Sequence, residues 1–268
     1  MNKHLYRTPA EVVALLLLAV ISVILVGLAN KSLGWPLYAA SFLLHLFTTR
    51  GAFRRHISLL YISLGLLGLI PITTDITNEN FIRMGLVLLA ALGLPFIVSR
   101  WLYKDKAIVF RWLHGRRWLK NEISYVLGTA IGAYLFLPFY LTSAGAYLNW
   151  GVDNTAESIT RLFIGTNALG IWDELFFVST VLGILRRYLP FWQANLLQAV
   201  LFTSFLFELG FTGWGPLVIY PFALSQGYIF KKTDSLLYVV TIHLTLDFFL
   251  FLALLNAHHP GLADIFVL

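Results

Sequence analysis

The sequence predicts an all-α, polytopic membrane protein: a transmembrane helix bundle of eight to nine spans with a cytoplasmic N-terminus. Of the 268 residues, 59% are hydrophobic and 12% are charged, whereas a soluble domain has about 45–50% apolar and about 25% charged residues. Apolar runs recur at the length of about 20 residues that crosses hydrocarbon. Basic residues are concentrated in alternate connections, which is typical of cytoplasmic loops.

The predicted spans cover residues 11–29, 33–49, 57–72, 81–99, 123–141, 158–185, 191–210, 215–230 and 235–256. The first lacks a small-residue cleavage site, so we interpret it as a retained span and not a signal peptide. The second, third and eighth are short, about 24 Å. They are expected to lie inside the bundle, or the second and third form a re-entrant hairpin. Residues 1–268 are expected to form one domain.

The orientation follows from the positive-inside rule, because 16 of the 19 Lys and Arg residues then lie on the cytoplasmic side. The net charge of +6 is explained by these loops, so we expect membrane lipids and not nucleic acid as partners. The longest loop, residues 100–122, is basic and carries three tryptophans. An amphipathic segment lying on anionic headgroups is favoured, and a regulatory or substrate-docking element is the alternative.

Several kinds of chemistry are not expected. Cysteine is absent, which excludes disulfides, thiolate catalysis and cysteine-ligated metal. No element carries three ligands at the spacing of a metal site, so we expect neither a metal nor another cofactor.

A few acidic residues interrupt the apolar spans. They are Asp173 and Glu174 in the sixth span, Glu208 in the seventh and Asp247 in the ninth, where His243 lies one helical turn before Asp247. A charged carboxylate at mid-bilayer costs about 2.5–3.5 kcal/mol, so three or four unpaired groups would cost on the order of 10 kcal/mol. These groups must therefore pair, take up a proton or line a wet cavity.

The depth of these residues predicts a shared site. Asp173, His243 and Asp247 lie 8 to 12 residues from the cytoplasmic ends of their spans, or roughly 12–18 Å at 1.5 Å per residue. The sixth and ninth spans run in opposite directions, yet their ionisable groups meet at one level. Glu208 lies closer to the outer end.

Carboxylates beside a histidine can hold and activate a water molecule. A buried carboxylate is a plausible general base, and an imidazole can donate to a developing oxyanion. Structural packing by a buried His–Asp pair is the alternative. Proton relay or proton-coupled transport fits the same residues and is a third hypothesis.

The last four spans resemble the CAAX protease and bacteriocin-processing (CPBP) membrane proteins, which include type II CAAX prenyl endopeptidases and lysostaphin-resistance-like proteins. The family pattern is Glu-Glu-x-x-x-Arg, then Phe-x-x-x-His, then His-x-x-x-Asn or Asp. The first motif corresponds to Asp173-Glu174 and the third to His243–Asp247, with residues 222–235 resembling the family's glycine-containing helix and basic turn. Residues 158–256 therefore form a core resembling the CPBP domain.

The resemblance implies a metal-free intramembrane endopeptidase acting on a membrane-embedded or prenylated protein or peptide, in a bacterial plasma membrane. Asp173, Glu174, His243 and Asp247 are the candidate catalytic residues, with Glu208 added because it is the ionisable group nearest the missing middle histidine. Leu206 occupies that histidine's position and Val178 replaces the arginine. A catalytically inactive relative that binds or regulates another membrane protein is the alternative.

Overall fold

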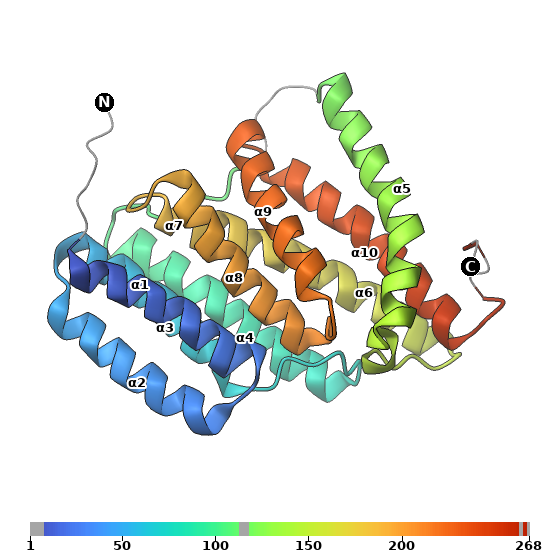
Figure 1. Cartoon of the computed structure of the whole chain (residues 1–268), viewed down its shortest axis with the longest axis horizontal. Helices are drawn as coiled ribbons and strands as arrows, with labels where there is room; N and C mark the ends of the chain where they lie inside the picture. Colours follow the sequence, from blue (N-terminus) through green and yellow to red (C-terminus); the bar gives the residue numbers. More distant parts are fainter. Residues whose placement is uncertain (1–7, 113–117, 263–264, 267–268) are drawn as a thin grey trace.

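The computed structural model describes residues 8–112, 118–262 and 265–266, and within these ranges it contains helices and no β-strand. The predicted all-α fold is confirmed. Nine helical rods run through the described part of the chain, and each overlaps one predicted span (Figure 1). Three of the rods contain π-helical segments, in which the turn is wider than in an α-helix.

The first four rods are α1 (Pro9–Ile21) with η1 (Ser22–Gly27), α2 (Lys31–Thr48), α3 (Gly51–Leu69), and α4 (Asn78–Ile97) with η2 (Val98–Leu102). The remaining five are α5 (Lys120–Ser143), the continuous rod α6 (Ala156–Asp173), η4 (Glu174–Val181) and α7 (Leu182–Leu185), then α8 (Phe191–Leu209), α9 (Pro216–Thr233) and α10 (Leu236–His258). A short 3-10 turn, η3 (Ala146–Asn149), follows α5.

Five of the described rods are long and apolar enough to cross a membrane, namely Pro9–Gly27, Asn78–Leu102, Lys120–Ser143, Ala156–Leu185 and Leu236–His258. Their outer faces carry large apolar side chains such as Leu16, Leu86 and Leu135, which are 60–63% exposed. Lipid tails accept such a surface, whereas water does not. The chain is an integral membrane protein. Crossing by the other rods and the cytoplasmic N-terminus stay predictions.

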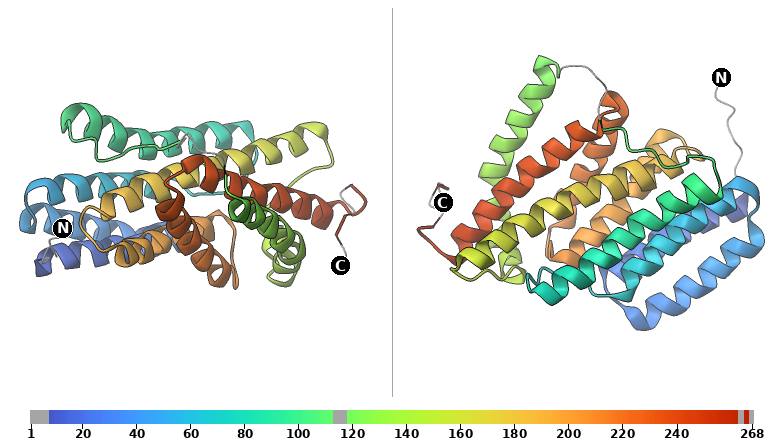
Figure 2. Two further views of the ribbon diagram at one scale, coloured as in Figure 1. Left: turned by 90° about the horizontal axis from the view of Figure 1, so that it is seen from above. Right: turned by 180° about the vertical axis from the view of Figure 1, so that it is seen from behind.

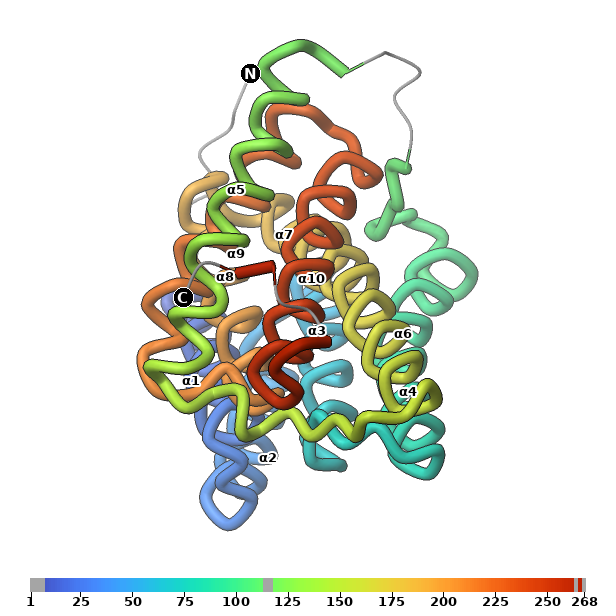
Figure 3. Tube along the Cα trace, turned by 90° about the vertical axis from the view of Figure 1, so that its right-hand side faces the viewer, coloured from blue at the N-terminus to red at the C-terminus, as the bar shows by residue number. Residues whose placement is uncertain are grey.

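The α6–η4–α7 rod lies at the centre of the molecule. It is the most buried of the five, with 72% of its apolar window inside the protein. Its η4 segment contacts α4, α8, α9 and α10. Figure 2 shows α6 between α4 and α10, and Figure 3 shows α5 on the outer side of α10. Side chains on the inner face of η4 are therefore enclosed by other helices.

Local sequence signals set the start of α6 and the α9–α10 hairpin. The side chains of Thr155 and Ser235 accept hydrogen bonds from amides in the first turns of α6 and α10, which satisfies donors that the helix itself leaves unpaired. Helix α9 ends at Thr233, and the next residue, Asp234, has a left-handed φ of 49°, which aspartate tolerates. The chain reverses there, so α9 and α10 pack as neighbours.

The basic loop is attached to the start of α10. Figure 2 shows residues 103–112 running from the end of α4 towards that helix. The carbonyls of Arg111 and Trp112 accept hydrogen bonds from the Leu236 and Leu237 amides, at 2.7 and 3.2 Å. Residues 113–117 of this loop lie outside the described residues, and its contact with headgroups stays a prediction.

Candidate active site

Four of the five predicted site residues meet in one buried cluster. Asp173 and Glu174 lie at the junction of α6 and η4, and His243 and Asp247 lie on α10. Asp173 and Glu174 are 1% and 0% exposed, and His243 and Asp247 are 5% and 7% exposed. We call these four residues the buried cluster.

Glu174 fixes the orientation of the imidazole. Its Oε1 lies 2.8 Å from Nδ1 of His243. Gln226 of α9 donates from Nε2 to the same oxygen at 3.1 Å, and to the carbonyl of Val239 at 3.3 Å. Three helical elements thus hold one imidazole through a network of neighbouring hydrogen bonds.

The other imidazole nitrogen faces two carboxyl groups across a gap. Nε2 of His243 lies 3.8 Å from Oδ2 of Asp173 and 3.8 Å from Oδ1 of Asp247, too far for direct hydrogen bonds. Oδ1 of Asp173 and Oδ2 of Asp247 are buried and have no hydrogen-bond partner in the described structure. Such atoms call for a partner that the protein itself does not supply.

A cavity of about 30 Å³ lies beside these unpaired atoms, and its lining includes Asp173, His243 and Asp247. This volume accommodates one water molecule, and the surrounding carboxyl and imidazole groups give it enough hydrogen-bond partners. We call it the water-sized cavity. Gly170 keeps α6 and α10 close here, since a Cβ at this position would overlap Oδ2 of Asp247.

Aromatic side chains confine the imidazole. The ring centroids of Phe222 and Phe202 lie 5.2 and 6.0 Å from that of His243. Both rings come from neighbouring helices, α9 and α8. Packing on these sides limits rotation of the imidazole and excludes bulk water.

Glu208 does not join the buried cluster. Its Oε1 accepts a hydrogen bond from the Ile72 amide at 3.1 Å, on the connection between α3 and α4. Leu206 instead lines the water-sized cavity. Two residues along a helix correspond to a rotation of about 200°, so Glu208 faces away and cannot replace the missing histidine.

Gln226 is a site residue that the sequence analysis did not select. The other site residues were selected because a charged side chain is costly in an apolar span. Gln226 is uncharged and does not carry that energetic cost. The residue is fully buried at 0% exposure. The only signal in the sequence that could have identified Gln226 was an amide side chain within an apolar helix.

A larger apolar cavity reaches the buried cluster from one side. It has a volume of about 340 Å³ and is lined by residues of α5, α8, α9 and α10, with His243 and Asp247 in its wall. Tyr125 and Phe136 of α5, which are 43% and 38% exposed, line it as well. The cavity therefore extends from the molecular surface to the cluster, and we call it the lateral cavity.

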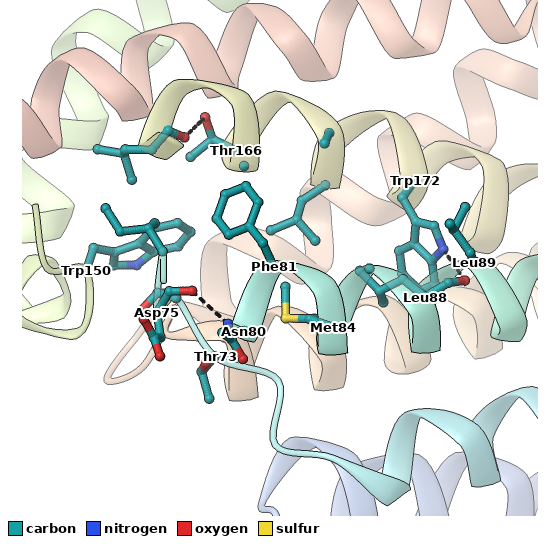
Figure 4. Close-up of a pocket in the computed structure, with 17 residues that line it drawn as sticks. Thr73, Asp75, Asn80, Phe81, Met84, Leu88, Leu89, Trp150, Thr166 and Trp172 are labelled. Carbon is teal, nitrogen blue, oxygen red and sulfur yellow. Dashed lines mark hydrogen bonds between the residues drawn. The ribbon is translucent and has the colours of Figure 1, made fainter. Parts of the chain in front are cut away.

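A second apolar cavity, of about 230 Å³, lies between α4 and α6 (Figure 4). Its wall includes Phe81, Met84 and Trp172. The indole Nε1 of Trp172 donates a hydrogen bond to the Leu88 carbonyl at 2.8 Å. This cavity contains no member of the buried cluster. Among the described residues, no group of three or more acidic or histidine side chains is placed to hold a metal ion.

Comparison with known proteins identifies the segment that carries this site. Residues 155–249 match the family model described as "Type II CAAX prenyl endopeptidase Rce1-like", and the predicted resemblance is confirmed. The match spans the complete buried cluster. No curated protein and no solved structure matches the chain.

Proposed function

We propose that this Rce1-like membrane protein is an intramembrane endopeptidase of the CAAX type, which hydrolyses a peptide bond in a lipid-modified or membrane-embedded substrate. The observation that carries the proposal is the water-sized cavity between Asp173, His243 and Asp247. These three residues lie inside the segment that matches the family model. A bacterial plasma membrane is part of the proposal, as the resemblance to the CPBP proteins implies.

The proposed reaction begins with a water molecule in the water-sized cavity. Asp173 accepts a proton from this water while the water oxygen attacks the scissile carbonyl carbon. The imidazolium form of His243, oriented by Glu174 at 2.8 Å, donates from Nε2 to the oxyanion that forms. Asp173 then gives its proton to the leaving nitrogen as the C–N bond breaks, and the products are a carboxylic acid and an amine. Asp247 holds the water from the opposite side.

The lateral cavity supports an apolar substrate. Its volume of about 340 Å³ falls in the range of about 300–1,000 Å³ that is typical of small-molecule sites. Phe136, Leu206 and Phe222 give it an apolar wall, and His243 lies beside them. A prenyl or acyl chain entering from the membrane would bring an attached peptide to the buried cluster.

The test is cleavage of a farnesylated peptide with a free C-terminus by the full-length protein in proteoliposomes, followed by mass spectrometry. Asp173→Asn and His243→Gln keep the shape of the site and should each lower the rate by at least about 100-fold. Glu208→Gln, a matched change of an acid outside the cluster, should retain the rate. Equal rates in all four proteins would refute the proposed mechanism.

The second candidate is an inactive relative that binds another membrane protein. Leu206 favours it, because a leucine lines the water-sized cavity where the family has a histidine. In that case no peptide would be cleaved, while crosslinking in membranes would recover one partner equally from wild type and Asp173→Asn. Proton flux in liposomes that Asp247→Asn abolishes would instead support transport.

A further inference from the structure

A third cavity is lined mainly by basic side chains and lies apart from the buried cluster. Its volume is about 460 Å³, and it is formed by residues 106–111, the η4–α7 segment and the C-terminal end of α9. Its charged lining residues are Lys106, Arg111, Arg186, Arg187, Lys231 and Asp234. We call this the basic cavity. Five cations and one acid leave it with a strong excess of positive charge.

Most of this charge has no acidic partner within the cavity. Arg111 forms an ion pair with Asp234. Arg187 donates from Nη2 to the backbone carbonyl of Lys106 at 3.1 Å, and this contact does not neutralise it. Asp234 is the single acid in a lining with five cations.

The remaining two cations lie over one aromatic ring. Lys231 Nζ and Arg186 Cζ are 4.2 and 5.7 Å from the ring centroid of Phe191. The ring stabilises them modestly and holds both near the cavity. Like charges gathered in this way repel one another, and an anion bound between them would offset that repulsion.

A neutral donor also lines the basic cavity. Ser179 of η4 is 3% exposed, and its Oγ is buried without a hydrogen-bond partner in the described structure. A buried hydroxyl of this kind requires an acceptor. Gly183 lies one helical turn further along, and a Cβ there would have no atom within 4 Å, so the wall beside Ser179 remains open.

We propose that the basic cavity binds the phosphate group of an anionic phospholipid. Arginine and lysine together with a hydroxyl are the donors that phosphate oxygens accept. The cavity lies at the ends of α7 and α9, on the face where the positive-inside rule places the anionic leaflet. Val109 and Phe230 add apolar surface, which suits the glycerol backbone next to the phosphate. Basic pockets between spans at this level are known to hold headgroups.

The experiment measures thermal unfolding of the full-length protein, purified in a phosphate-free maltoside detergent, by tryptophan fluorescence. Phosphatidylglycerol is titrated alongside diacylglycerol, which lacks the phosphate, and oleate, which carries a carboxylate. We expect saturable stabilisation by phosphatidylglycerol alone. Inorganic phosphate is a separate arm: stabilisation by phosphate equal to that by the lipid would keep the site and identify a free phosphate as its ligand.

The double variant Arg186→Gln/Lys231→Gln should require at least about tenfold more phosphatidylglycerol for half-maximal stabilisation, because it removes two phosphate contacts. The matched control Arg100→Gln/Lys104→Gln removes two exposed cations outside the basic cavity and should respond like wild type. If the double variant does not fold, Ser179→Ala provides the same comparison. An equal response of pocket and control variants, or of oleate and phosphatidylglycerol, would overturn the proposal.

Discussion

Replacing Gly170 by alanine should displace the Asp247 carboxylate from the buried cluster. A Cβ at residue 170 would lie 3.1 Å from Cγ of Asp247 and 3.2 Å from Cδ2 of His243, and it would overlap Oδ2 of Asp247 outright. Restoring van der Waals contact requires a movement on the order of 1 Å. A displacement of that size at a reacting centre costs about 100-fold in rate, and we expect at least that loss of peptide cleavage.

Gly93→Ala is the matched control, because a Cβ at Gly93 of α4 would have no atom within 4 Å. Both substitutions should stabilise the helix by about 1 kcal/mol, because alanine has a higher helix propensity than glycine. Only Gly170→Ala adds overpacking, which costs about 1–3 kcal/mol. The two variants should therefore differ in Tm by about 2–12 °C, Gly170→Ala being the lower. Identical Tm values and cleavage rates would refute the close packing of α6 on α10 that this reasoning requires.

Three further predictions concern single side chains. Glu174→Gln should lower kcat about 10- to 100-fold with little change in KM, since it weakens a charge-assisted hydrogen bond to the imidazole; an unchanged kcat would contradict this. Leu206→His should raise kcat about tenfold by adding a donor to the water-sized cavity, whereas the size control Leu206→Met should not; equal rates would place residue 206 away from the reacting atoms. Burial raises the pKa of Asp105, but hydrogen bonds from His56, Ser99 and the Ala107 amide outweigh it and hold the pKa below its usual value. Such a carboxylate stabilises the fold above its unfolded pKa of about 3.9 and loses this effect as pH falls through its folded pKa. Asp105→Asn should therefore lower Tm by about 2–4 °C at pH 7, and this difference should shrink as pH falls through the folded pKa of Asp105; a difference as large in acid as at pH 7 would contradict the assignment.

The helices and the composition of the buried cluster could be predicted from the sequence because both follow from the low solubility of charge in hydrocarbon. Apolar runs defined the rods, and the placement of Asp173, His243 and Asp247 at one depth predicted a shared site. Their meeting is observed, with Nδ1 of His243 2.8 Å from Glu174. Their catalytic role stays a prediction.

Other features depend on tertiary packing and had no signal in the sequence. The wider turns of η4 begin at Glu174, and no pattern in the sequence predicted them. Glu208 satisfied the charge criterion, yet helix rotation turns it towards the Ile72 amide. The basic cavity is lined by three segments that lie far apart in the chain. Basic residues that the sequence places in separate loops therefore line one cavity.

The attachment of α10 to the loop before α5 has a mechanical consequence. The first amides of α10 are held by the carbonyls of Arg111 and Trp112, and His243 follows on the same uninterrupted helix. The imidazole lies roughly 10 Å along the helix axis from the first residue of α10, so a shift of the start of this helix would carry His243 with it. Sliding or tilting of the 111–112 segment would therefore change the distance from His243 to Asp173 and Glu174 on the neighbouring rod, whereas Asp247 on α10 would move together with His243.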